Sequence, residues 1–467
     1  SVSFSEDVGL RYAAYGWQVQ HVADGNDLDA IERAIKVAQS VPNQPSLIAV
    51  RTIIGYGAPH KENTYEVHGS PLGPDEVLAA KKNLGWPTEP AFLLPGEALE
   101  HFRQALTTGG EEQAAWQARL DAYTLAFPDL AAELKRRVSG ELPEGWDANL
   151  PSFPADPKGL ATRKAGQKVI QALGQRLPEL MGGSADLDPS TFTNLEGQGD
   201  FESPLTTGDG AQGTNGAPWG PAGRNIHFGV REHGMGAIVN GLAAHGAFIP
   251  YGSTFLIFSD YMRPPIRLAA IMKIKPILIY THDSIGLGED GTTHQPVEQL
   301  ACLRSIPNVT VIRPADANET VQAVRLAIEH QGGPVCLILT RQNISIIETG
   351  NYKTNGDLGR GAYILSEPDR APELILIATG SEVELILQAQ LKLKENGIAA
   401  RVVSMPSWEL FEKQDDNYKQ RIFPKGLRKR LAVEAASPMG WHKYTTDEGD
   451  MLGMTRFGES APAADLF

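Results

Sequence analysis

The stretch THDSIGLGEDGTTHQPVEQ, residues 281–299, gathers acidic side chains and imidazoles between glycines. It contains His282, Asp290 and His294 and directly follows the apolar run PILIY, where the end of a parallel strand would open into a crevice. Such side chains bind polar ligands, and histidine also transfers protons near neutral pH. The composition equally fits a solvated loop with Asx-type turns. Without cysteine or a helical histidine spacing, it does not favour a zinc site.

A carboxylate stands where the segment HFGVREHGM turns from a strand-like to a helix-like pattern. Glu232 at this position has two interpretations. It complements the positive end of a helix dipole, or it is a carboxyl group among apolar neighbours whose raised pKa suits proton donation. The residue pattern leaves both open.

The segment STFLIFSDY spaces three aromatic residues at every third position: Phe255, Phe258 and Tyr261. Residues three apart share a helical face or cluster in a tight turn. Aromatic stripes usually belong to the core, and the alternative is a planar pocket for a flat heteroaromatic ring.

Two arginines lie at the borders of expected elements. Arg341 follows the strand-like run VCLILT, and Arg163 precedes an amphipathic helix. Either guanidinium can bind a phosphate bidentately, and either can form a surface ion pair. Asp186 and Ser190 follow the apolar segment LPELM and point to the same crevice, whereas His68 in YEVHGSPLG is ambiguous on its own.

Apolar runs alternate with helix-like segments along most of the chain, a pattern typical of parallel α/β layers. Strands are expected at 17–22, 46–53, 226–228, 276–280, 309–312, 335–340, 374–378, 400–403 and 430–433. Helices are expected at 28–41, 162–173, 232–245, 317–330 and 382–396, with further helices in the connector at 90–155. This pattern predicts one partial and two complete α/β domains, at 1–150, 151–345 and 346–467.

The bulk composition excludes several classes of protein. With 42% apolar and 21% charged residues, the 467-residue chain is typical of globular proteins. A net charge of −14 argues against nucleic-acid and anionic-membrane binding. No apolar run approaches the roughly 18 residues that span a bilayer, and SVSFSEDV is a poor signal peptide. Cys302 and Cys336 fit a reducing compartment.

Taken together, these motifs resemble the transketolase family of thiamine-diphosphate enzymes. The resemblance covers essentially the whole chain and includes TIIGYGAP, VHGSPLG, GGSADL, HFGVREHGM, ATGSEVEL, VVSMPS and FGESAP, in family order. It implies a multi-domain α/β fold, with parallel-sheet thiamine-diphosphate-binding domains and a C-terminal α/β domain. It also implies transfer of a two-carbon ketol unit between sugar phosphates, in a homodimer whose active sites form at the subunit interface.

The resemblance assigns cofactor roles to individual residues. Glu232 is similar to the catalytic glutamate that hydrogen-bonds the aminopyrimidine ring. Phe255, Phe258 and Tyr261 resemble the pocket for that ring, and Asp186 resembles the acidic residue beside the thiazolium.

The resemblance also assigns substrate roles. Asp290 would read the hydroxyl at C2. His68 and His294 would line the path to the thiazolium, bind substrate and handle protons, with His68 also touching the cofactor. The phosphate of the sugar would be held by four residues: Arg163, Ser190, His282 and Arg341.

One family element is expected to lie upstream of Ser1. It is the Gly-Asp-Gly and later Asn that ligate Mg²⁺ (or Ca²⁺) and the diphosphate, so the resemblance predicts a chain that lacks most of its N-terminal domain and has no metal ligands. The GDG at 208–210 is not a substitute, because a polar segment with Pro204 precedes it and Asn240 lies in a helical run. It is interpreted as a surface loop.

Two other functions remain open at this point. One is another thiamine-dependent ketol or acyl transferase, of the dihydroxyacetone synthase or deoxyxylulose-phosphate synthase type. The other is a non-catalytic fragment. The expected location is the cytoplasm, or the plastid stroma for a plant-like source, and the pathway (pentose phosphate or carbon fixation) stays open.

Overall fold

The structure is a computed structural model that describes residues 3–203, 213–214, 219–348 and 358–467. The chain divides into two compact units, residues 1–121 and 122–467. Each unit is considered by itself.

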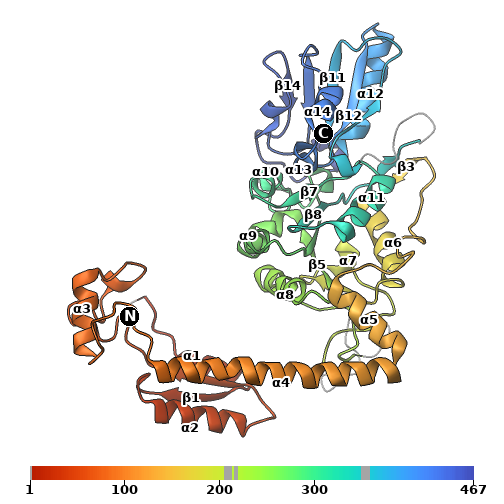
Figure 1. The fold of residues 1–467 in the computed structure, drawn as a ribbon. Helices are drawn as coiled ribbons and strands as arrows, with labels where there is room; N and C mark the ends of the chain where they lie inside the picture. The colour runs from red at the N-terminus through yellow and green to blue at the C-terminus, as the bar shows by residue number, and fades with distance from the viewer. Residues whose placement is uncertain (1–2, 204–212, 215–218, 349–357) are drawn as a thin grey trace. The chain divides into compact units, whose positions relative to one another are not determined.

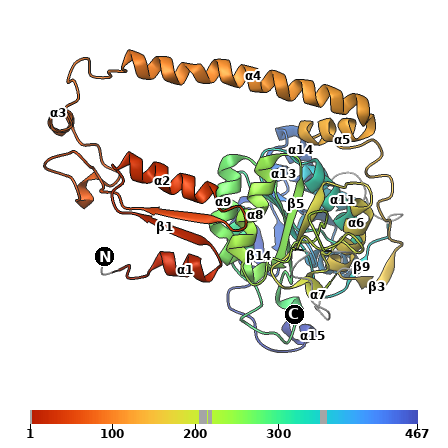
Figure 2. The same cartoon turned by 90° about the horizontal axis from the view of Figure 1, so that it is seen from below.

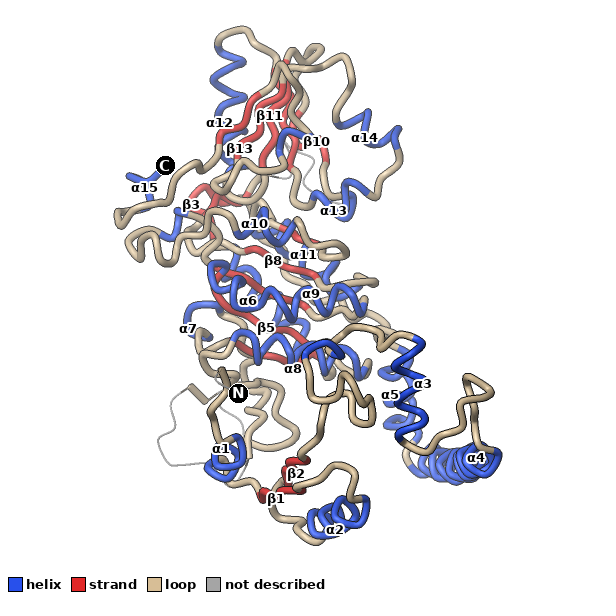
Figure 3. The backbone as a smooth tube through the Cα atoms, turned by 90° about the vertical axis from the view of Figure 1, so that its left-hand side faces the viewer, coloured by secondary structure: helices blue, strands red, loops and turns tan. Residues whose placement is uncertain are grey.

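The first unit contains a pair of parallel strands, β1 (Gln18–Val22) and β2 (Ser46–Val50), with Gln18 opposite Ser46. Helices α1 (Val8–Ala14) and α2 (Leu28–Gln39) pack against this pair (Figure 3). Each helix begins after an aspartate whose carboxylate accepts a backbone N–H of the first turn, at 3.0 Å for Asp7 and 2.9 Å for Asp27. The strand expected at 46–53 ends at Val50.

A helical segment follows, in agreement with the connector expected at 90–155. The 3-10 turn η1 (Tyr65–Val67) and α3 (Pro74–Asn83) lead to the long helix α4 (Gly96–Ala126). Helix α5 (Pro128–Ser139) belongs to the second unit and ends at Gly140, which adopts the left-handed conformation typical of helix ends.

The second unit is built around a five-stranded sheet in which every neighbouring pair is parallel, in the order β4-β5-β6-β8-β7. The strands are β4 (Leu180–Ser184), β5 (Ile249–Phe255), β6 (Ile277–Thr281), β7 (Thr310–Ile312) and β8 (Val335–Ile338). Every residue of these strands is buried, as expected for a parallel sheet that is covered on both faces.

Helices cover both faces of this sheet (Figures 1 and 2). Successive side chains of β6 point to opposite faces, so Ile277 and Ile279 pack with one group of helices and Leu278 and Tyr280 with the other. The first group is α6 (Thr162–Gly174) and α11 (Ala317–Glu329). The second group is α8 (Glu232–His245), α9 (Arg263–Met272) and α10 (Gln299–Arg304), together with the 3-10 helix η2 (Leu256–Met262).

A second sheet in the same unit has the order β10-β12-β11-β13-β14 and is parallel except for the β10–β12 pair (Figure 1). Its strands are β10 (Tyr363–Ser366), β11 (Leu374–Ala378), β12 (Ala400–Ser404), β13 (Arg430–Val433) and β14 (Asp450–Leu452). Helix α12 (Glu382–Glu395) covers one face, and α13 (Trp408–Glu412) and α14 (Asp416–Ile422) the other. The chain leaves β11 toward β12 and returns on the other side to form β13.

The remaining elements are short. Strands β3 (Asp156–Leu160) and β9 (Ile344–Ile346) pair antiparallel, and α7 (Asp188–Thr191) follows β4. The others are α15 (Ala463–Leu466) and the 3-10 turns η3 (Ile285–Leu287), η4 (Leu358–Arg360) and η5 (Trp441–Lys443).

The multi-domain parallel α/β class expected from the sequence is confirmed, with two local corrections. The strand expected at 226–228 is wrong, because these residues form no strand and the only pairing next to them is two isolated bridges of the preceding residue, Asn225, to Gly182 and Asp200. Strand β5 was not expected, since its sequence IPYGSTF contains proline and glycine, which sequence patterns associate with turns.

Candidate active site

Four predicted site residues lie just beyond the ends of four neighbouring strands. Asp186 follows β4, Phe255 ends β5, His282 follows β6 and Arg341 follows β8. Because these strands are parallel and adjacent, all four residues lie along one edge of the sheet. The carboxyl edge of a parallel sheet is where α/β proteins usually bind ligands.

Arg163 reaches the same edge from the first turn of α6. The backbone N–H of Thr162 donates to Thr340 Oγ1 at 3.0 Å, and the N–H of Thr340 donates to Thr162 Oγ1 at 2.7 Å. This reciprocal pair fixes the start of α6 beside the end of β8, so Arg163 and Arg341 are brought together. Arg163 Nη1 also donates to the carbonyl oxygen of Ser190 at 2.5 Å, so Ser190 joins the group.

The two arginines define a candidate anion site. Burial, followed by the charge of Arg341, lowers the pKa of Arg163 to about 10. Among the described residues, no acidic side chain forms an ion pair with either guanidinium, and the buried Nε of Arg163 has no hydrogen-bond partner. Two neighbouring cations without a carboxylate favour an anionic ligand such as a phosphate, which accepts bidentate hydrogen bonds from guanidinium groups.

His282 completes this anion site as a neutral imidazole. Its ring is buried and its Nδ1 lies 2.8 Å from Thr281 Oγ1. Burial, with the charges of Arg163 and Arg341 and the nearby His294, lowers the pKa of His282 to about 3. A neutral ring keeps both a donor and an acceptor nitrogen near neutral pH.

Replacing His282 with glutamine should remove part of the acid sensitivity of folding. The folded pKa lies below the ordinary value of 6.5, so the unfolded chain binds more protons in the window between them and stability falls as pH drops through it. Between about pH 7.5 and about pH 5, wild type should lose about 2 kcal/mol more than H282Q. Urea unfolding at both pH values measures the difference. Equal losses in the two proteins would contradict the depressed pKa.

The three predicted aromatic residues form a stack. Phe255 ends β5, and Phe258 and Tyr261 lie in η2, a 3-10 helix, whose three residues per turn align side chains at every third position. The ring centroids of Phe255 and Phe258 are 6.0 Å apart at 15°, and those of Phe258 and Tyr261 are 6.2 Å apart at 29°. Phe255 also stacks on His282 at 3.6 Å, so the stack adjoins the anion site.

His294 approaches the same stack from the glycine-rich loop. Its ring lies edge-on to Phe258, with centroids 5.7 Å apart, and its Nδ1 is 3.0 Å from Thr293 Oγ1. Asp290 is exposed on this loop. Gln295 holds the loop in place, because its Nε2 donates to the carbonyl oxygens of Gly288 and Glu459, each at 2.9 Å.

Glu232 is the first residue of α8, the helix that packs against β5 and η2. Its side chain is half-buried, and the N-cap residue before it, Arg231, makes no side-chain capping hydrogen bond. Asp186 is exposed after β4 and adopts a positive φ of 61°. A flat stack of rings beside a helix that begins with a half-buried carboxylate fits a heteroaromatic ring with hydrogen-bonding nitrogen atoms.

His68 does not belong to the group of site residues in the second unit. It lies exposed in the first unit, directly after η1, whereas the other predicted site residues belong to the second. The GDG at 208–210 lies outside the described residues. Asn240 lies within α8 and donates its amide to the carbonyl oxygen of Pro265 at 2.8 Å, in agreement with its expected helical position.

In residues 3–203, 213–214, 219–348 and 358–467, no group of three or more His, Cys, Asp or Glu side chains is arranged to hold a metal ion. No helix in these same ranges is long and apolar enough to cross a bilayer.

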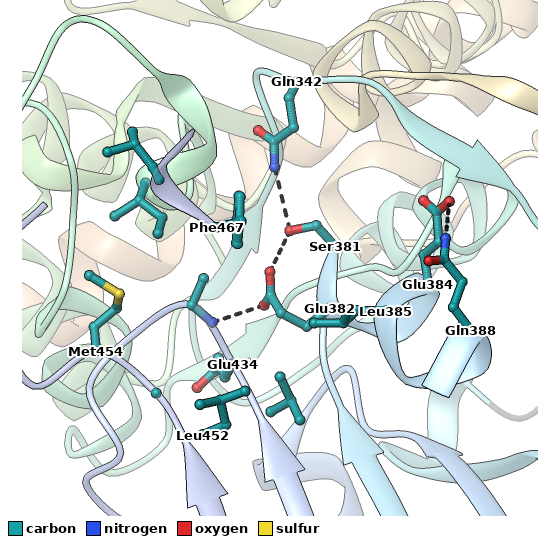
Figure 4. A pocket seen from close by; sticks show the side chains of 15 residues that line it. Gln342, Ser381, Glu382, Glu384, Leu385, Gln388, Glu434, Leu452, Met454 and Phe467 are labelled. Atoms are coloured by element: carbon teal, nitrogen blue, oxygen red, sulfur yellow. Dashed lines mark hydrogen bonds between the residues drawn. The ribbon is translucent and has the colours of Figure 1, made fainter. Parts of the chain in front are cut away.

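Sequence reasoning missed a buried group of charges directly behind the anion site. Asp283 and Arg313 form an ion pair in which both side chains are 0% exposed, and Arg313 also pairs with Glu382 of α12. Beside them, a cavity of about 410 Å³ opens at the carboxyl ends of β11 and β13 (Figure 4). No predicted site residue lines this cavity. The only signal in the sequence was Asp283, the acidic residue immediately after His282. Its position just after strand β6 makes it buried.

Comparisons with known proteins agree with this fold. Three family models match in succession: the transketolase thiamine diphosphate binding domain at 1–143, the transketolase pyrimidine binding domain at 158–346 and the transketolase-like C-terminal domain at 361–467. The match over residues 1–143 does not support the expectation that most of the N-terminal domain is missing.

Among curated proteins, a transketolase of Nostoc sp. is 50% identical over 465 residues, which cover 99% of this chain and 67% of that protein. Transketolase 1 of Aliivibrio fischeri is 48% identical, with 99% and 68% covered. The chain thus spans about two thirds of the length of these relatives.

Solved structures give the same result. A Pichia stipitis transketolase in complex with sedoheptulose 7-phosphate has a TM-score of 0.90 and 40% identity, over 100% of this chain and 66% of that one. A transketolase of Leishmania mexicana has a TM-score of 0.88 and 38% identity, with the same coverage. The fold and the three matching family models place the chain in the thiamine-diphosphate class of α/β proteins. Within that class, the chain belongs to the transketolase family.

Proposed function

We propose that this chain transfers a two-carbon ketol unit from a ketose phosphate, such as xylulose 5-phosphate, to an aldose phosphate, such as ribose 5-phosphate. The observation that carries the proposal is the anion site of Arg163, His282 and Arg341 next to the aromatic stack. This arrangement can bind a phosphate at one end of a substrate and a planar cofactor ring nearby.

The aromatic stack and Glu232 are proposed to hold the pyrimidine ring of thiamine diphosphate. Phe255, Phe258 and Tyr261 would contact its face, Glu232 would share a hydrogen bond with a ring nitrogen, and Asp186 would lie beside the thiazolium. The cofactor supplies the electron sink that carbon–carbon cleavage of a ketose requires. The carboxylate of Glu232 would hold a proton at the ring nitrogen, and the neighbouring rings would exclude water.

Arg163, Arg341, His282 and Ser190 are proposed to bind the substrate phosphate. Fixing this remote group orients the reacting end of the sugar and uses binding energy for catalysis. Three residues would act nearer the reacting carbons. Asp290 would contact the C2 hydroxyl, and His294 and His68 would handle hydroxyl protons. His68 would come from the thiamine diphosphate binding domain.

The assembly is proposed to be a homodimer, with the active site at the subunit interface. Helices α8 and α9 expose apolar side chains, among them Ile238 at 51%, Leu268 at 53% and Ile271 at 58%, and such surfaces favour association. A divalent cation, Mg²⁺ or Ca²⁺, would accompany the diphosphate, with ligands not assigned to residues of this chain. A reducing compartment, the cytoplasm or a plastid stroma, is proposed as its location.

A donor comparison tests the proposed function. With thiamine diphosphate, Mg²⁺ and ribose 5-phosphate present, xylulose 5-phosphate should be consumed and sedoheptulose 7-phosphate formed. Pyruvate, the donor expected for a deoxyxylulose-phosphate synthase, should give no product with glyceraldehyde 3-phosphate. Turnover of pyruvate alone would favour that alternative. Failure to turn over either donor, in a protein that binds the cofactor, would favour a non-catalytic role.

A further inference from the structure

We propose that Ser381 and Glu382, at the start of α12 in the C-terminal domain, are positioning residues for the phosphate site. They would fix His282 and Arg341 through the residue that follows each of them. The inference deepens the proposed function and rests on its phosphate site.

The first connection runs from His282 through Asp283. His282 has a positive φ of 59°, a conformation that a residue without a glycine's freedom keeps only when its surroundings impose it. The next residue, Asp283, is buried, and its Oδ2 accepts from Arg313 Nε at 2.9 Å and lies 2.8 Å from Nη2. This ion pair, in which one carboxylate oxygen faces two guanidinium nitrogens, restrains the backbone at the position where His282 leaves β6.

Arg313 in turn is held by the C-terminal domain. Its Nη1 donates to the carbonyl oxygen and to Oγ1 of Thr379, each at 3.0 Å, and it forms an ion pair with Glu382. Glu382 is itself fixed, because its Oε2 accepts from the backbone N–H of Ala435 at 3.1 Å. Both charged side chains are buried, so the geometry of the pair is not relaxed by solvent.

The second connection runs from Arg341 through Gln342. Gln342 Nε2 donates to Ser381 Oγ at 3.4 Å, and Ser381 Oγ donates to Glu382 Oε1 at 2.7 Å (Figure 4). Gly286 packs against the other side of this amide, where an added Cβ would lie 2.6 Å from Nε2. Two residues of the phosphate site, on separate strands, are therefore anchored at the same two residues of α12.

The shared anchor has a specific functional consequence. Disturbing it displaces the two groups that would bind the phosphate, whereas within the aromatic stack it directly affects only the contact of Phe255 with His282. A loss of purely structural origin would lower affinity for any sugar, whereas a loss of positioning lowers affinity for the phosphorylated sugar.

The test compares E382Q with E384Q in the purified chain. Glu384 lies in the same turn of α12 and lines the same cavity, but its carboxylate accepts from Ser345 Oγ at 2.7 Å and makes no link to Arg313. Binding of ribose 5-phosphate and of ribose is measured by titration calorimetry and ligand-observed NMR. E382Q should reduce the preference for the phosphorylated sugar by about tenfold, the effect expected from a disturbed charge-assisted hydrogen bond, and E384Q should leave it unchanged.

The same substitution made in the H282A variant distinguishes a positioning role from a general loss of structure. When His282 is already replaced, E382Q should reduce the preference for the phosphorylated sugar by clearly less than it does in the wild-type chain, because the connection from Glu382 to the phosphate through His282 is already lost. Equal preferences in wild type, E382Q and E384Q would overturn the inference alone. A wild-type chain that does not distinguish the two sugars would overturn the proposed phosphate site and this inference with it. If E382Q does not fold, S381A provides the same comparison, because it removes the hydroxyl group that accepts from Gln342 Nε2 and, at 3.3 Å, from Arg313 Nη2; an unchanged preference there would overturn the inference.

Discussion

Replacing Glu232 with glutamine should lower kcat for ketol transfer by about 10²- to 10⁴-fold, the range that positioned acid–base groups contribute. The amide keeps the size of the carboxyl group and loses the ability to hold or release the proton at the cofactor ring nitrogen. Because α8 forms without a side-chain capping hydrogen bond from its N-cap residue Arg231, and Glu232 is only its first residue, the substitution should not unfold the helix. Turnover of xylulose 5-phosphate with ribose 5-phosphate measures the effect.

A matched control is E298Q, which alters an exposed carboxylate directly before α10 in the same unit. It should retain full activity. Exchange of the cofactor's thiazolium C2 proton, followed by NMR, gives a second readout that does not depend on substrate. If E232Q exchanges this proton and turns over substrate at the wild-type rate, the assignment of Glu232 to catalysis is wrong, and the carboxylate serves only the helix dipole.

Replacing Arg341 with glutamine should lower kcat/KM for xylulose 5-phosphate by about tenfold to a hundredfold, since hydrogen bonds to charged groups contribute about 1.5–3 kcal/mol. The same change should leave kcat/KM for erythrulose, a ketose without phosphate, within about twofold of wild type. The physical reason is that Arg341 and Arg163 lie together without an acidic partner among the described residues, so the ligand supplies the missing negative charge.

R176Q is the control for this experiment. Arg176 lies just past the end of α6 opposite to Arg163 and is exposed, so its loss changes the net charge equally without altering the anion site. An equal fall for both donors in R341Q would indicate that the arginine supports the fold or the cofactor and not the phosphate.

The regular elements could be predicted from sequence wherever their periodicity was clear. Helix α8 and strands β11 and β13 have the predicted bounds. Prediction failed where turn-forming residues occur inside strands, as in β5, whose Pro250 and Gly252 are accommodated in a fully buried parallel strand. It also failed at 226–228, which form no strand, although the preceding residue Asn225 makes two isolated bridges.

The local groups of the site could be anticipated in the same way. The three-residue spacing of the aromatics allowed a stack, and the position of Arg341 after a strand placed it at the sheet edge. The partner residues could not be anticipated, because Asp283, Arg313 and Glu382 are far apart in sequence and meet only through the packing of two domains. The roles of individual residues stay predictions until the variants are measured.

The 3-10 helix η2 imposes a constraint on the length of this segment. Each residue turns such a helix by a third of a circle, so a substitution at Ile257 or Ser259 leaves the direction of the aromatic side chains unchanged. Inserting or deleting one residue between Phe255 and Tyr261 would instead rotate the second ring away from the first. Over evolution the stack should therefore accept changes of residue type between its rings and reject changes in their number.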